Sequence, residues 1–108
     1  MIGQVSIAAA TAIVGYDLCR DQLWKTAGYP RAIAGVGLCG SAAAGDTKVI
    51  LYVGTSRIGE FYNLATGFPT KDHIIPVANR VPAGQNISAI VEDAPATNPI
   101  NLTLELVP

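Results

Sequence analysis

The glycine pattern at Gly35, Gly37 and Gly40 comes nearest in this sequence to a site for chemistry. It matches the G-x-G-x-x-G spacing that holds a dinucleotide pyrophosphate at the start of a helix. Such a site needs a helix of about ten residues after the glycines, because the helix N-terminus supplies the amides and the dipole. Only residues 41–44 separate the pattern from Gly45 and Asp46. We therefore predict a glycine-rich strand with close backbone packing and no cofactor.

A single histidine, His73, lies beside Asp72 and just before a predicted strand. Acyl transfer needs a nucleophile held against a histidine and an acid that orients it, but no serine here lies in a G-x-S-x-G turn. One histidine also cannot supply the multi-histidine metal site of a cupin-like barrel enzyme. The carboxylates do not alternate as in a metal-binding loop. We expect His73 at the surface or at a strand end, and neither a catalytic residue nor a metal site.

Cys19 and Cys39 are too few for a disulfide framework. The first four residues carry no positive charge ahead of the apolar run 6–15, so we expect no signal peptide. That run is also far shorter than the roughly 20 residues that span a bilayer, so we expect no membrane insertion. The prediction is two buried, reduced thiols, with a disulfide as the alternative if the protein works outside a cell.

The charge content is low: 50% of the residues are hydrophobic and 14% are charged, whereas soluble domains carry about 25% charged residues. The net charge is −1 and the charges are scattered singly, so no basic stripe favours nucleic acid. Too few charges are present to cover the exterior, and large apolar patches on monomers are uncommon. The composition therefore favours a homo-oligomer.

Aromatic side chains are the remaining candidates for a binding surface. In a β-domain they serve more often as core or subunit contacts than as stacking platforms for sugars. Trp24, Tyr29 and Phe68 are predicted on loops. The candidates for interface or ligand-stacking roles are Trp24, Tyr29, Tyr52, Phe61, Tyr62 and Phe68.

These side chains must be positioned by short strands, because 11 glycines and 7 prolines interrupt the chain. The clearest strand is Asn101–Leu106, in which leucine alternates with polar residues. A second alternating stretch, Asn86–Glu92, precedes it, and the turn-rich residues 92–99 predict an antiparallel hairpin between the two. Lys48–Val53 is apolar on both faces and is expected to be central, with Arg57–Leu64 as its partner.

The other elements are shorter or less regular. His73–Val77 predicts a strand that Pro76 confines to an edge or a strand end, and Val81–Gly84 predicts a turn. Arg31–Leu38 predicts another strand. Alternation at Val5, Ile7 and Ala9 favours a first strand, although the alanines leave a short helix as an alternative. Asp17–Lys25 predicts one helical turn with Asp17 as the N-cap.

Seven or eight short strands predict a single all-β domain over residues 1–108. We expect an antiparallel β-sandwich with at most one short helical turn. A small barrel is the alternative architecture.

The stretches 73–77, 81–87 and 101–106, together with the alanine- and glycine-rich, charge-poor composition, resemble small jelly-roll structural proteins of viruses, such as capsid decoration and vertex proteins. The resemblance implies an eight-stranded jelly roll, commonly a trimer, that sits on a virion and has no active site. It carries no functional residue over to this chain. The alanine-rich start and residues 17–25 lie outside it.

The first functional hypothesis is therefore a structural subunit, a capsid or capsid-decoration protein, that acts through self-association without catalysis. Its partners would be further copies of itself, as a trimer, and a larger protein shell, with no nucleic acid and no membrane. It would be located in the virion, or otherwise in the cytoplasm. The alternative hypothesis is a carbohydrate-binding β-sandwich module.

Overall fold

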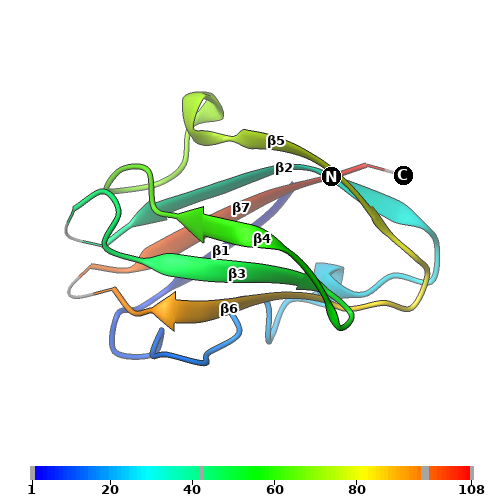
Figure 1. Cartoon of the computed structure of the whole chain (residues 1–108), viewed down its shortest axis with the longest axis horizontal. Helices are drawn as coiled ribbons and strands as arrows, with labels where there is room; N and C mark the ends of the chain where they lie inside the picture. The colour runs from blue at the N-terminus through cyan, green and yellow to red at the C-terminus, as the bar shows by residue number, and fades with distance from the viewer. Residues whose placement is uncertain (1, 42, 96–97, 108) are drawn as a thin grey trace.

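The computed structural model describes residues 2–41, 43–95 and 98–107, and shows two antiparallel sheets packed face to face (Figure 1). The four-stranded sheet has the order β1 (Ile2–Ile7), β7 (Ile100–Val107), β2 (Arg31–Gly40), β5 (Ile75–Val81). The three-stranded sheet has the order β4 (Ser56–Tyr62), β3 (Lys48–Val53), β6 (Ile87–Asp93). The expected all-β antiparallel sandwich is confirmed.

Two short 3-10 turns, η1 (Leu23–Lys25) and η2 (Lys71–His73), are the helical elements of the described chain, one more than expected. The predicted N-cap was wrong, because η1 starts after Gln22, several residues beyond Asp17. Neither turn approaches the length and hydropathy of a helix that could cross a membrane, and the described residues hold no other helix.

Alternation of side chains produces the core between the sheets. In β7, Leu102, Leu104 and Leu106 are buried in the core, as the sequence pattern predicted. Inward-facing residues of the other sheet, such as Leu51 and Val91, pack in the same core. Each fully buried aliphatic side chain contributes about 1.5–3 kcal/mol to folding, so this apolar layer is the main source of stability.

The predicted hairpin between the last two strands was wrong. β6 pairs with β3, whereas β7 pairs with β1 and β2, so the two strands lie in different sheets. Residues 96–97 of the predicted turn lie outside the described residues. The turn-forming residues predict that the chain reverses, but they do not predict which sheet the next strand joins. With β6 and β7 in opposite sheets, the apolar faces of both strands pack in the core.

The stretch from β3 to β5 shows two confirmed predictions and one error. β3 and β4 form the expected antiparallel hairpin. β5 lies at the edge of its sheet, as Pro76 required. Val81, however, does not begin a turn: it pairs with Arg31 at the end of β5 and is buried. Its apolar side chain gains more from the core than from the solvent-exposed turn, which therefore starts after it.

After β1, the chain crosses the sandwich and runs beside β6, as seen along the lower side of Figure 1. Gly15 N–H donates to Val91 O at 2.8 Å, Val91 N–H to Tyr16 O at 2.9 Å, and Leu18 N–H to Ala89 O at 2.8 Å. Asp17 forms an isolated antiparallel bridge with Ile90. Residues 15–18 thus pair, like a short additional strand, with the edge of β6 that does not pair with β3.

The glycine pattern lies within β2, as the strand interpretation predicted, and the strand shifts register between Ile33 and Gly35. A side chain at Gly37 would come within 2.7 Å of Ile74 and 3.0 Å of Pro69. The loop that contains Pro69 and Ile74 therefore packs directly on the outer face of the four-stranded sheet. The glycines serve close packing between a strand and a loop.

Candidate functional site

The six aromatic candidates do not form one cluster. Phe61 lies in the core, and Trp24 packs against the core where a side chain on Gly3 would come within 2.7 Å of its ring. Tyr52 is half-buried on the three-stranded sheet. Exposed aromatic surface that could meet a partner or ligand is therefore provided mainly by Tyr29, Tyr62 and Phe68.

A block of uncharged polar side chains lies on the outer side of β1 and β7. Ser6 pairs with Asn101 and Gln4 pairs with Thr103, so the four residues share one face of the sheet. This face is opposite to the one on which the β7 leucines enter the core. The strict alternation of β7 predicted its polar side, but β1 could be added to it only from the register.

Phe68 lies beside this block of polar side chains. The block and Phe68 line a hollow of about 190 Å³. Asn101 Nδ2 donates to the carbonyl of Gly67 at 2.7 Å, which fixes the backbone just before the phenyl ring. Asn101 Oδ1 is buried and has no hydrogen-bond partner among the described residues. An unsatisfied buried amide oxygen is costly, so it marks a place where a donor is missing.

We call this side of the molecule the uncharged face, made by the outward residues of β1 and β7 together with Phe68. Its exposed apolar side chains are Phe68 (70% exposed), Ile2 (60%) and Val107 (43%). Glu105 is the one charged residue among the outward positions of these two described strands. Surfaces that become buried between subunits are depleted of charge in this way.

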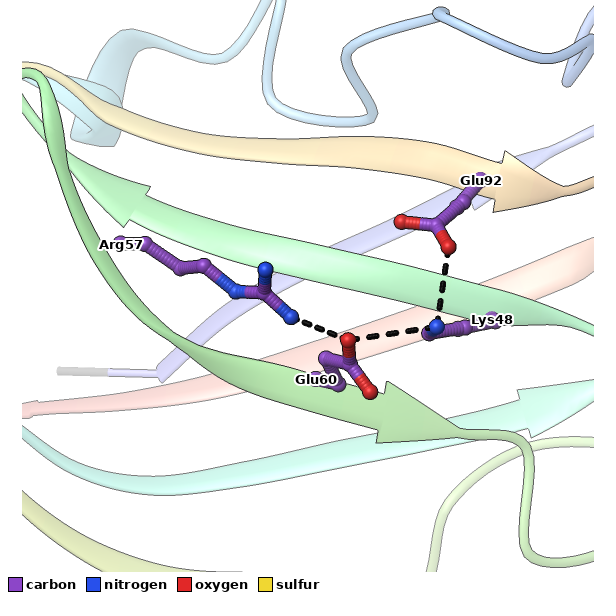
Figure 2. Close-up of polar contacts among 4 residues, drawn as sticks. All are labelled: Lys48, Arg57, Glu60 and Glu92. Carbon is purple, nitrogen blue, oxygen red and sulfur yellow. Dashed lines mark hydrogen bonds and ion pairs between the residues drawn. The ribbon is translucent and has the colours of Figure 1, made fainter.

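The outer side of the three-stranded sheet has the opposite character. Lys48 on β3 contacts Glu92 on β6 at 2.9 Å and Glu60 on β4 at 3.2 Å, and Arg57 also pairs with Glu60 (Figure 2). The four charges sum to zero and cross all three strands. Because their partners come together only through the strand register, sequence inspection did not find this network.

The network shifts the pKa values of two of its members. Hydrogen bonds to Glu92 and Glu60 raise the pKa of Lys48, and the hydrogen bond from Lys48 lowers the pKa of Glu60. The pairing of Glu60 therefore stabilises the fold at pH values above the pKa that this carboxyl has in the unfolded chain. This stabilisation is lost as the pH falls through the lowered value. Exposed pairs of this kind contribute little each, so the network gives this face its polarity more than its stability.

His73 and the two cysteines have structural positions. His73 Nδ1 accepts a hydrogen bond from Thr70 N–H at 3.1 Å, which caps η2 just before β5, near the strand end where it was expected. Cys19 and Cys39 are free and buried, as predicted, and burial raises the pKa of both thiols. Within residues 2–41, 43–95 and 98–107, no three His, Cys, Asp or Glu side chains gather where they could hold a metal ion.

Comparison with models of protein families gave no match, and comparison with curated proteins gave none either. The case for a function therefore depends on the surfaces described above.

Proposed function

We propose that this chain is a structural subunit that acts by self-association, without catalysis, and that copies meet through the uncharged face. The observation that carries the proposal is the contrast between the two outer sides of the sandwich. One side presents a charged network to water, while the other exposes Ile2, Val107 and Phe68 around uncharged polar groups. A face that exposes several apolar side chains and little charge resembles surfaces that a partner subunit covers.

A second copy of the chain is the partner that this face suits. Glu105 is half-buried, so two such faces can meet without bringing exposed like charges together. The polar groups between the apolar side chains can hydrogen-bond across the contact, as at ordinary interfaces. Contact between two like faces closes a dimer, whereas in a trimer each copy would place this face against a different surface of the next copy. Attachment to a larger protein shell is the wider role.

The strand order supports a role of this class. Residues 15–18 lie beside β6, so that residues 15–18, β6, β3 and β4 form a four-stranded arrangement in this order. It packs opposite the sheet of β1, β7, β2 and β5, and we therefore assign the sandwich to the jelly-roll type. If residues 15–18 are counted as a strand between β1 and β2, the chain changes sheets at each connection except β3 to β4. Eight strands connected as two Greek keys define the jelly roll, which viral capsid proteins and lectins both use.

Replacement of Ile2 by Glu tests the contact. We expect the variant to dissociate at least about tenfold more readily than the wild type, because the contact would bury an unpaired carboxylate. Ile13→Glu is the matched control, since Ile13 is also an isoleucine with 60% of its surface exposed and lies outside this face. Size-exclusion chromatography with light scattering across a concentration series measures the effect.

Two results would contradict the proposal. One is a wild-type chain that stays at its monomer mass of 11.2 kDa at every concentration. The other is equal dissociation of the Ile2→Glu and Ile13→Glu variants, since the uncharged face would then have no special part in the contact.

Carbohydrate binding is the second candidate, and the hollow beside Phe68 favours it. An exposed phenyl ring can stack on the apolar side of a sugar, while Gln4, Ser6 and Thr103 offer hydrogen bonds to its hydroxyls. Trp24 packs on the core side of β1, so its fluorescence would not report a ligand in this hollow.

The sugar hypothesis predicts amide chemical-shift changes at Asn101 and Thr103 when glycans from an array screen are titrated into labelled protein. Phe68→Ala should weaken such binding about fivefold or more, because stacked rings contribute about 1 kcal/mol. Phe68→Leu, which keeps an apolar side chain but no ring, should weaken it nearly as much. Absence of any glycan response would leave self-association as the use of this face.

A further inference from the structure

Arg31, the first residue of β2, is an arginine held almost entirely inside the protein. It is 6% exposed and shares a strand face with the core residue Ile33. Its Nη1 donates to the carbonyl of Trp24 at 2.5 Å. Nε and Nη2 are buried and have no hydrogen-bond partner among the described residues. A guanidinium cannot lose its proton to escape this situation, so the buried charge calls for an anion.

A second arginine lies beside it. Arg80 on β5 is opposite Ala32, one register position from the pair of Arg31 and Val81, so its side chain leaves the edge strand on the outer face whereas that of Arg31 leaves on the core face. Arg31 and Arg80, with Pro30 and Ala32, line a hollow of about 160 Å³. Neither arginine forms an ion pair with a carboxylate in the described part of the chain.

The surroundings of Arg80 are also basic. Arg80 lines a second hollow, of about 340 Å³, to which β4 contributes Ser56 and Arg57 and the other side contributes Asn79 and Gln85. No Asp or Glu is among the described residues that line either hollow. Arg57 already shares Glu60 with Lys48, so of the arginines that line these two hollows Arg31 and Arg80 have no carboxylate partner among the described residues.

We propose that Arg31 and Arg80 form a binding site for a single oxyanion group, a phosphate, sulfate or carboxylate. Two guanidinium groups suit such a ligand because their planar N–H donors match the spacing of its oxygens and form charge-assisted hydrogen bonds. The bound group supplies the acceptors that Nε and Nη2 of Arg31 lack. This site is separate from the uncharged face and does not depend on self-association.

Thermal unfolding of the full chain with increasing inorganic phosphate, at constant ionic strength, tests the site. Wild-type protein should unfold at higher temperature as phosphate rises, since a ligand that binds only the folded state stabilises it. Arg80→Gln should reduce the apparent phosphate affinity at least tenfold. Arg80 is exposed, so this variant is expected to fold. Arg20→Gln is the control, because Arg20 is an exposed arginine on the segment beside β6 and lines neither hollow.

Arg31→Met provides a second test. It should abolish the response to phosphate, while its midpoint without phosphate should stay close to that of the wild type, because an apolar side chain replaces an unpaired buried charge. In labelled wild-type protein, phosphate should shift the amide signals of Ala32 and Arg80. Equal phosphate responses in wild type and Arg80→Gln would overturn the proposal, as would an Arg20→Gln variant that loses the response to the same extent.

Two further arms identify the source of the oxyanion. Acetate in place of phosphate tests whether a carboxylate suffices. If the group belongs to a second copy of the chain, phosphate should dissociate the wild-type oligomer and Arg80→Gln should weaken it. If the group is a free ion, phosphate should raise the unfolding midpoint and leave the oligomer intact. The thermal-unfolding measurements with phosphate need no oligomer, so failure of the Ile2→Glu experiment would leave them unaffected.

Discussion

Replacement of Asn63 by Leu is expected to cause one of the largest losses of stability available in this chain. Asn63 is 1% exposed and its side chain joins three backbone groups that follow β2 and precede β3. Nδ2 donates to Gly40 O at 2.8 Å and to Ala43 O at 2.7 Å, and Oδ1 accepts from Thr47 N–H at 2.8 Å. Leucine has the same branching but is larger and can make none of these bonds.

The variant leaves a buried donor at Thr47 and a buried acceptor at Gly40 without partners. Each unsatisfied buried group costs about 1–3 kcal/mol, so we expect a loss of about 3 kcal/mol or more in the free energy of unfolding. For a chain of this size the thermal midpoint should fall by about 10 °C or more. Urea unfolding and calorimetry measure the two quantities.

Asn98→Leu is the control for this prediction. Asn98 is exposed, and its side chain makes a single long contact of 3.4 Å with Ser41 O. Its replacement should change the free energy of unfolding by no more than about 0.5 kcal/mol. If the two variants lost equal stability, the polar contacts of Asn63 would not be what holds residues 40–47 in place.

Gly40→Ala is the second variant with a large expected effect. Gly40 has φ of +122°, in the region that favours glycine. A Cβ there would fall against the carbonyl oxygen of Pro99 and 3.0 Å from Ile100 Cα. Both neighbours are backbone, so neither can rotate away. We expect a loss of about 4 kcal/mol or more, measured by denaturant unfolding.

Gly84→Ala separates the two causes of this loss. Gly84 also has positive φ, +82°, but nothing lies within 4 Å of the position that a Cβ would take. This control should lose only about 1 kcal/mol, the conformational part of the cost. A Gly40→Ala variant no less stable than Gly84→Ala would show that the close approach to Pro99 has no energetic weight. The last glycine of the G-x-G-x-x-G pattern would then lack the packing role assigned to it.

Local patterns predicted much of the fold. The alternation of Asn101–Leu106 specified both the strand and its buried face, and the β3–β4 hairpin followed from two strand-like runs joined by a short turn. The destination of β6 could not be predicted in the same way. Alternation describes which side of a strand is apolar, whereas the choice of sheet depends on contacts between residues far apart in the chain.

The candidate surfaces were harder to predict. Residue type alone cannot separate Phe61, which lies in the core, from Phe68, which is exposed on a loop. The block formed by β1 and β7 joins residues about a hundred positions apart, and the Lys48 network joins three strands. Arg31 gave no signal in the sequence, because burial of a charged residue is visible only in three dimensions.

The pairing of residues 15–18 with β6 affects how copies of this chain could assemble. This pairing uses the backbone groups at the β6 edge of the three-stranded sheet. The edge strands β4 and β5 carry Arg57 and Pro76, and a charge or a proline on an edge strand discourages pairing with another chain. Among the sheet edges formed by the described residues, β1, which carries no charge or proline, is left as the one open to strand addition. A molecule with one such edge can pair once and then stops, which favours closed particles over endless fibres.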